Sequence, residues 1–227
     1  MTDFQLTAVA LIAIWLTLVA IRFRRSTIVL TGGMFVVGLY TMIALIDHRL
    51  TTRALGLSAS ASWPSTIAFA AGWLALMLAY SPVADRIATR WVAKPPDLRT
   101  FSMLQQSTLK LLIGIVVAWL LGGFLEELIF RGILLQSIEA LIAPRFAMPL
   151  AAAVAIVVAA IGAGVIHLYQ GLRAAIIITQ LSMLFGLLFV VSGHNLWAVI
   201  ICHGLYDTIA FVRFARKKSR YSQVDAG

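Results

Sequence analysis

Six ionisable side chains lie within stretches of the sequence that are otherwise apolar. In chain order they are Glu126, Glu127, Arg131, His167, His203 and Asp207. A charged group in hydrocarbon is costly unless it is paired or hydrated, so ionisable residues of this kind mark candidate functional sites. Carboxylates and imidazoles together can activate water: a carboxylate takes a proton from the water, and an imidazole positions the water or relays the proton.

Helical spacing predicts which of these groups pair with each other and which stay available for chemistry. Glu127 and Arg131 are four residues apart, so they share one face of a helix and can form an ion pair. Glu126 is rotated by about 100° from Glu127, which leaves its carboxylate available for chemistry. His203 and Asp207 are also four residues apart and point the same way. We therefore expect Glu126, His203 and Asp207 to converge with His167 on one water molecule and the oxyanion it forms.

Each of these residues also has a structural interpretation. The Glu127–Arg131 pair is more simply a structural ion pair than a catalytic one. Glu126 could be a buried, protonated and hydrogen-bonded carboxyl group, and His167 could be an ordinary interfacial histidine. His203 and Asp207 could bond only each other. His48 and His194 lie in loops and receive no role.

Composition determines which elements must position these groups. Hydrophobic residues make up 61% of the 227 residues and charged residues only 12%, whereas soluble domains carry about 25% charged residues. Lipid must therefore be the main solvent, and long unbroken apolar runs indicate helices rather than a barrel. We predict an all-α, polytopic helical bundle with seven spans, at 4–21, 27–46, 63–82, 110–137, 147–167, 173–192 and 195–214.

The basic residues predict the orientation of this bundle. Fourteen of the 18 Lys and Arg fall on one side of the membrane if the N-terminus lies outside, and only Arg49, Arg53 and Arg145 fall on the other. Because cytoplasmic loops are enriched in Lys and Arg, we expect the N-terminus out and the C-terminus in. The net charge of +9 therefore reflects topology. With no compact basic domain, we expect no nucleic-acid partner.

No composition shift or repeat divides the chain, so we predict one transmembrane domain over 1–227. The longest polar connection is 83–109, in which 101–104 could form a short amphipathic helix on the membrane. The single Cys202 excludes an internal disulfide. Lying in an apolar run, it is expected to be inert packing.

The chain resembles a known family at Glu126-Glu127-x-x-x-Arg131, followed by His167 in the next span and His203-x-x-x-Asp207 in the last. These motifs are similar to those of the CAAX protease and bacteriocin-processing (CPBP, or Abi) family, which includes the CAAX prenyl endopeptidases. The resemblance covers roughly 104–214 as a catalytic core, and leaves 1–103 as accessory spans and a cytoplasmic loop. It implies an intramembrane protease of the glutamic type.

By position, the resemblance implies that Glu126 activates water, that His167 assists, and that His203 and Asp207 stabilise the tetrahedral intermediate. Glu127 and Arg131 complete the first motif. Two positions depart from the family pattern. Ala163 stands where the family usually has Phe, which suggests close helix packing or a wider cavity. An ionised Asp207 cannot donate to an oxyanion, so it must be protonated, orient His203 or bind a metal.

The leading hypothesis is an intramembrane endopeptidase acting on a membrane-associated protein or peptide. Its expected location is the inner membrane of a bacterial or archaeal cell. A zinc-dependent version is possible by residue type, but no span offers His-Glu-x-x-His, so we expect no cofactor. The alternatives are a non-catalytic immunity or partner-binding protein of the same fold, and a small transporter or proton relay.

Overall fold

Every regular element in the described part of the chain is helical. The computed structural model describes residues 2–22, 27–58 and 62–224, and seven of its helices are long and apolar enough to cross a membrane. The prediction of an all-α integral membrane protein with seven spans is confirmed. Arg24 and Arg25, which entered the charge count, lie outside the described residues.

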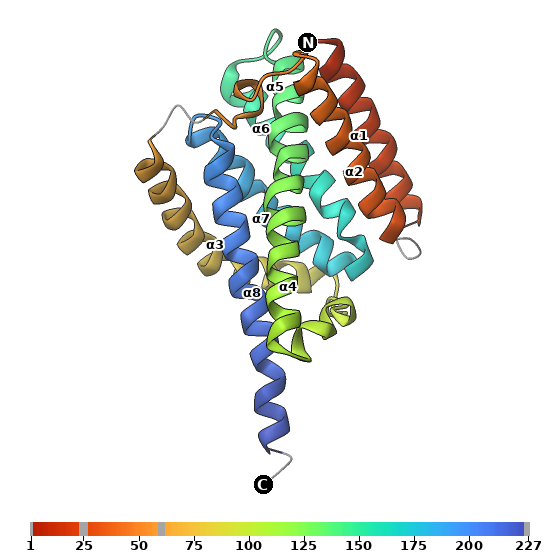
Figure 1. Cartoon of the computed structure of the whole chain (residues 1–227), viewed down its shortest axis with the longest axis vertical. Coiled ribbons are helices and arrows are strands. Elements are labelled where there is room, and N and C mark those ends of the chain that lie inside the picture. Colours follow the sequence, from red (N-terminus) through yellow and green to blue (C-terminus); the bar gives the residue numbers. More distant parts are fainter. Residues whose placement is uncertain (1, 23–26, 59–61, 225–227) are drawn as a thin grey trace.

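The elements form one bundle, and the two chain termini lie at opposite ends of its long axis (Figure 1). An odd number of spans requires this arrangement. Short 3-10 or π-helical segments are labelled η. In chain order the elements are α1 (Asp3–Arg22), α2 (Thr27–Ile46), η1 (Arg53–Leu55), α3 (Trp63–Trp91), η2 (Arg99–Gln105), α4 (Thr108–Ala118), η3 (Trp119–Glu126), η4 (Leu128–Leu135), α5 (Gln136–Ile142), α6 (Met148–Ile166), η5 (Leu168–Gln170), α7 (Leu172–Val191) and α8 (Leu196–Val224). The orientation of the bundle in the membrane stays a prediction.

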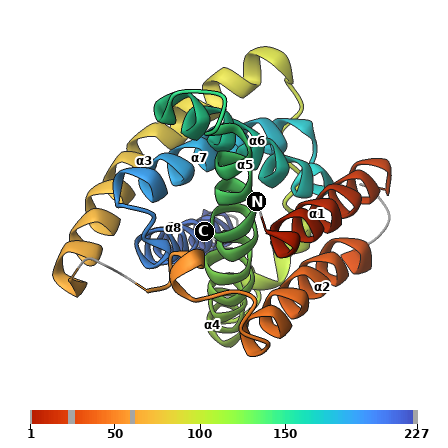
Figure 2. The same cartoon turned by 90° about the horizontal axis from the view of Figure 1, so that it is seen from above.

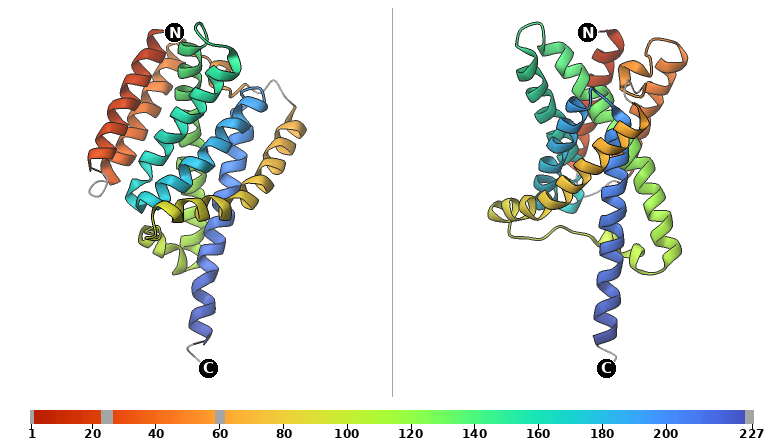
Figure 3. Two further views of the ribbon diagram at one scale, coloured as in Figure 1. Left: turned by 180° about the vertical axis from the view of Figure 1, so that it is seen from behind. Right: turned by 90° about the vertical axis from the view of Figure 1, so that its left-hand side faces the viewer.

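The third span was predicted too short. Instead of ending at 82, α3 continues through Pro82 to Trp91. Proline removes one backbone hydrogen bond and bends a helix, so a bend rather than an end follows Pro82. Beyond it, the helix runs across the long axis of the bundle (Figure 3). The short helix expected at 101–104 forms as η2, a 3-10 helix.

Small residues bring the helices that frame the site close together. Gly164 of α6 lies so near Thr179 of α7 that an added Cβ would overlap the threonine hydroxyl. A Cβ on Gly162 would lie 3.0 Å from the ring of Phe130 in η4. Small residues at helix interfaces allow such approaches in membranes. The small-residue stretch that departs from the family pattern at Ala163 therefore packs α6 tightly against both neighbours.

The last span is central to the arrangement. α8 packs against α3, α4 and η3, and Figure 2 shows it near the middle of the bundle between α3 and α4. Its first turn is held by Asn195, whose Oδ1 accepts from the amides of Trp197 at 3.1 Å and Ala198 at 3.4 Å. Asn195 Nδ2 in turn donates to Thr66 Oγ1 of α3 at 2.8 Å. This capping sets the height at which α8 presents His203.

Candidate active site

The first motif lies on a widened helix. The span Thr108–Ile142 changes from α-helix to π-helix over η3 and η4, which carry Glu126, Arg131 and the residues around them. The α-helical geometry assumed from the sequence was therefore wrong here. π-Helical turns are rare and are frequent at functional sites. Glu127 and Arg131 nevertheless pair, because residues four apart still lie on neighbouring turns.

Glu127 is the centre of a buried charge network. Its side chain is fully buried, and its Oε2 lies 3.1 Å from Arg131 Nη1. Its Oε1 accepts from Arg131 Nη1 at 3.2 Å and faces His203 Nδ1 at 2.6 Å. A carboxylate can only accept hydrogen bonds, so Nδ1 of His203 must be the donor in the second contact. Glu127 therefore fixes the orientation of His203 as well as pairing with Arg131.

Two residues of α7, Ser182 and Phe185, also contact the side chains of this network. Arg131 Nη2 donates to the backbone oxygen of Ser182 at 2.7 Å and to its hydroxyl at 2.6 Å. The ring of Phe185 stacks on His203, with centroids 4.7 Å apart, and lies 5.5 Å from the Arg131 guanidinium carbon. The same turn of α7 thus holds Arg131 by hydrogen bonds and His203 by stacking.

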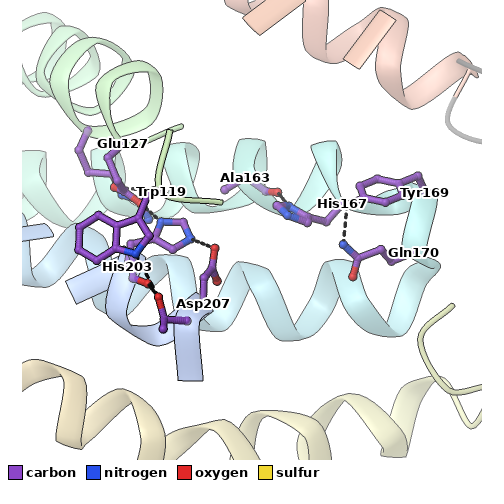
Figure 4. A network of polar contacts seen from close by, with 11 residues as sticks. Trp119, Glu127, Ala163, His167, Tyr169, Gln170, His203 and Asp207 are labelled. Carbon is purple, nitrogen blue, oxygen red and sulfur yellow. Dashed lines mark hydrogen bonds and ion pairs between the residues drawn. The ribbon is translucent and has the colours of Figure 1, made fainter. Parts of the chain in front are cut away.

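His203 lies between two carboxylates (Figure 4). Its Nε2 is 3.5 Å from Asp207 Oδ2, which is longer than a well-formed hydrogen bond between nitrogen and oxygen. The two side chains are therefore near neighbours on one helical face, as predicted, without saturating each other. Both remain partly exposed, at 14% and 24%.

His167 is fixed in one tautomeric arrangement by its own helix. It ends α6, and its Nδ1 lies 2.8 Å from the carbonyl oxygen of Ala163. A carbonyl oxygen only accepts, so Nδ1 carries a hydrogen and, in the neutral ring, Nε2 has a lone pair available. Ala163, which stands where the family pattern has Phe, thus contributes its backbone oxygen to this contact.

The predicted residues lie within electrostatic range of one another, but among them, in the described part of the chain, direct contacts join only Glu127, Arg131, His203 and Asp207. Asp207 interacts electrostatically with His203, Glu126 and His167, and Glu126 interacts with His203, Glu127 and Arg131. The sequence left open how His167, at the end of its span, could reach His203, which is early in its own. In the structure α6 runs obliquely to α8 (Figure 3), and His167 interacts electrostatically with Asp207 and His203, although no hydrogen bond or ion pair joins it to either in the described residues. Among the described residues, Glu126 has no hydrogen-bond partner.

The segment that carries this site matches a known family. Residues 108–209 match the family model described as type II CAAX prenyl endopeptidase Rce1-like. Over these residues the chain is similar to that family. No curated protein and no solved structure matches the chain significantly. The expected resemblance to the CPBP family is confirmed over this segment, which contains all six ionisable residues with which the sequence analysis began.

The Rce1-like segment also contains contacts that the sequence did not suggest. Trp119 packs on Gly204 of α8, and its Nε1 donates to Thr208 Oγ1 at 3.0 Å. Ser182 and Phe185 likewise look like ordinary residues of an apolar span. The only signal for Ser182 was a polar side chain in an apolar span, and Thr179 and Gln180 of the same helix share that feature. His194 pairs with Glu139 at 3.0 Å, outside this cluster.

A zinc site does not fit the Rce1-like cluster. In the part of the chain that the structure describes, no three His, Cys, Asp or Glu side chains are grouped as metal ligands would be. His203 Nδ1 is occupied by Glu127 at 2.6 Å, which leaves that ring only Nε2 for any further ligand bond. Metal independence stays a prediction.

Gly122 of the Rce1-like segment leaves room for Asp207. A Cβ at this position would lie 3.0 Å from Asp207 Oδ2 and 3.6 Å from His203 Nε2. We expect Gly122→Ala to displace the Asp207 carboxyl and lower turnover by about a hundredfold, because small misplacements of reacting groups cost that much. Thermal stability should not fall, since alanine favours a helix over glycine. The measurement is kcat of the purified variant together with its Tm.

Gly72→Ala is the matched control for this prediction. A Cβ on Gly72, in α3, would meet nothing within 4 Å. We expect full activity in the control. Wild-type turnover in Gly122→Ala, or an equal loss in both variants, would contradict the assignment of Gly122.

Proposed function

We propose that the protein is an intramembrane endopeptidase that hydrolyses a peptide bond of a membrane-associated protein or peptide. The Rce1-like match supports a hydrolase of the CAAX protease type. The proposal is supported by the geometry around His203, which contacts Glu127 at 2.6 Å and lies 3.5 Å from Asp207, with Glu126 and His167 within electrostatic range. Such a group inside apolar helices is costly unless function requires it.

In the proposed reaction, Glu126 is the general base. It is the carboxylate not bound by Arg131, which pairs with Glu127. Glu126 takes a proton from water, and the water oxygen attacks the carbonyl carbon of the scissile bond. His167 positions that water through Nε2, because its Nδ1 is bound by Ala163.

His203 stabilises the oxyanion that results, and Asp207 assists as a protonated carboxyl donor or by orienting His203. A donor at Nε2 of His203 requires the imidazolium form, because Nδ1 already donates to Glu127. The 3.5 Å gap between Nε2 and Asp207 Oδ2 leaves Nε2 uncommitted to Asp207, so that it can donate to the oxyanion. When the intermediate collapses, the carbon–nitrogen bond breaks and Glu126 returns its proton to the leaving amine.

Glu127, Arg131, Ser182 and Phe185 act as positioning residues. Catalysis by preorganised donors depends on their being fixed before the charge develops. Glu127 holds one edge of His203 and Phe185 holds its face, while Ser182 anchors Arg131 at the other end of the network. None of the four contacts the proposed water directly.

A cleavage assay with defined peptides tests this function. The purified protein, reconstituted in lipid vesicles, is incubated with a prenylated peptide carrying a C-terminal CAAX sequence, with the same peptide lacking the prenyl group, and with acylated membrane-anchored peptides. We expect a single cleavage site in at least one membrane-anchored peptide, detected by mass spectrometry. Binding of these peptides without any cleavage would instead support a non-catalytic partner-binding protein.

Asp207→Asn tests the metal-free form of the mechanism. An amide can donate a hydrogen bond from a similar position, so we expect the variant to keep much of the wild-type turnover. If a zinc ion were bound, the same change would remove an anionic ligand and lower metal affinity sharply. The measurement is turnover together with bound zinc in both proteins. Stoichiometric zinc in the wild type that falls with activity in the variant would overturn this assignment.

A further inference from the structure

The end of α3 has the geometry of a helix at a membrane surface. Past Pro82, residues 83–91 run across the long axis of the bundle, whereas the preceding part of α3 descends obliquely along it (Figure 3). At 1.5 Å per residue this segment is about 13 Å long. We call residues 83–91 the α3 surface segment.

One side of the α3 surface segment is apolar and exposed. Val83, Ile87 and Trp91 follow one another at four-residue spacing and are 42%, 36% and 79% exposed. Ala84 and Ala88, on the adjoining face, are buried against the bundle. An exposed apolar stripe with tryptophan at its end is typical of helices that lie in the membrane interface.

The next face of the same segment is basic. Arg86 and Arg90 are exposed, lie one turn apart and, among the described residues, have no hydrogen-bond or ion-pair partner. Together with Pro82, Asp85 and Thr89 they line an open hollow of about 500 Å³.

Two other cations of this region, Arg173 and Arg99, are already bound. Arg173 makes a bidentate contact with Asp85 at 2.7 and 2.8 Å. The hydrogen bond from the Arg99 guanidinium lowers the pKa of Asp97 to about 2, so that Arg99 and Asp97 satisfy each other. Arg86 and Arg90 therefore stand out as a pair of uncompensated charges beside an apolar stripe.

The α3 surface segment is held firmly in place. Its Asp85 is bound by Arg173 of α7, and Arg173 Nη1 also donates to the Ala93 carbonyl oxygen at 3.3 Å. A few residues on, the Asp97 amide donates to the Gln170 carbonyl oxygen at 2.7 Å. The segment and the connection after it are thus fixed to the turn that follows His167, and Arg86 and Arg90 are presented by a rigid element.

We propose that the α3 surface segment lies in the membrane interface and binds the phosphate of an anionic phospholipid between Arg86 and Arg90. Guanidinium groups bind phosphate through paired, charge-assisted hydrogen bonds, and basic residues beside an apolar helical face recognise anionic headgroups. The apolar stripe selects a lipid over a soluble anion, because Val83, Ile87 and Trp91 need hydrocarbon beside them. This site is separate from the proposed protease activity.

The test is retention of lipid by the purified protein. Wild-type protein is equilibrated in nanodiscs with increasing phosphatidylglycerol in phosphatidylcholine, and bound lipid is counted by native mass spectrometry. We expect selective retention of phosphatidylglycerol, weakened about tenfold or more in Arg86→Gln/Arg90→Gln because two charge-assisted contacts are lost. Arg86→Lys/Arg90→Lys should recover part of the binding, since charge remains but the bidentate geometry does not.

Arg53→Gln/Arg145→Gln is the matched control, because it removes the same charge from two exposed arginines in the loops predicted for the opposite face. The control should retain lipid as the wild type does. Equal retention by all variants, or an equal loss in the control, would overturn the site. So would tighter binding of a soluble acidic peptide than of phosphatidylglycerol, which would assign the arginines to a protein partner.

Discussion

Glu126→Gln is expected to abolish cleavage while the protein stays folded and inserted. Glu126 is the one carboxylate of the first motif that Arg131 does not bind, and it interacts electrostatically with His203 across the site. Glutamine keeps the size of the side chain but cannot accept the proton of the attacking water. Losing a general base typically lowers the rate by about 10² to 10⁴-fold. The measurement is turnover of the purified variant in vesicles.

Glu139→Gln provides the matched control for this loss. Glu139 is also buried and pairs with a histidine, His194, but it lies outside the cluster. The control should keep activity close to that of the wild type. If Glu126→Gln retained more than about a tenth of wild-type turnover, Glu126 could not be the base.

Arg131→Met is expected to lower stability more than any other single change in the network. Arg131 is only 1% exposed and neutralises Glu127, which is fully buried. Removing one partner of a buried ion pair typically costs about 3–5 kcal/mol, because the other charge is left unpaired in a low dielectric. The measurement is the thermal midpoint of the purified variant in detergent, compared with the wild type.

The double variant Glu127→Leu/Arg131→Met separates charge from packing. Both variants leave the Ser182 oxygens without Arg131, and the double variant also removes the contact between Glu127 and His203, so the difference between them reports the Glu127 carboxylate without its guanidinium. We expect the double variant to be more stable than Arg131→Met, because it contains no buried lone charge. A double variant that melts at or below the single one would show that the ion pair is not what Arg131 supplies.

The spans and local pairs could be predicted from the sequence because they depend on short-range rules. Twenty or so apolar residues indicate a membrane helix wherever they occur, and a four-residue spacing brings Glu127 to Arg131 whatever surrounds them. The same rule brought His203 and Asp207 to one face. The family resemblance added the order of the roles, which remain proposals.

The contacts between helices could not be predicted in this way. Whether Glu127 reaches His203 depends on how the η3–η4 span crosses α8, and Ser182 and Phe185 enter the site only because α7 packs there. Spacing within one helix carries no information on crossing angles. The bend at Pro82 was missed for a related reason, because a proline can either end or bend a helix and tertiary contacts such as Asp85–Arg173 decide.

Incorporation of oxygen from water into the product reports whether the protein hydrolyses a peptide bond with activated water. Wild-type protein in vesicles cleaves a membrane-anchored peptide in water enriched in oxygen-18, and the fragments are weighed by mass spectrometry. Hydrolysis by activated water predicts one labelled oxygen in the new carboxyl group of the N-terminal fragment, and no such fragment with Glu126→Gln. An unlabelled fragment, equal labelling by Glu126→Gln, or no cleavage of any membrane-anchored peptide by the wild type would contradict the account.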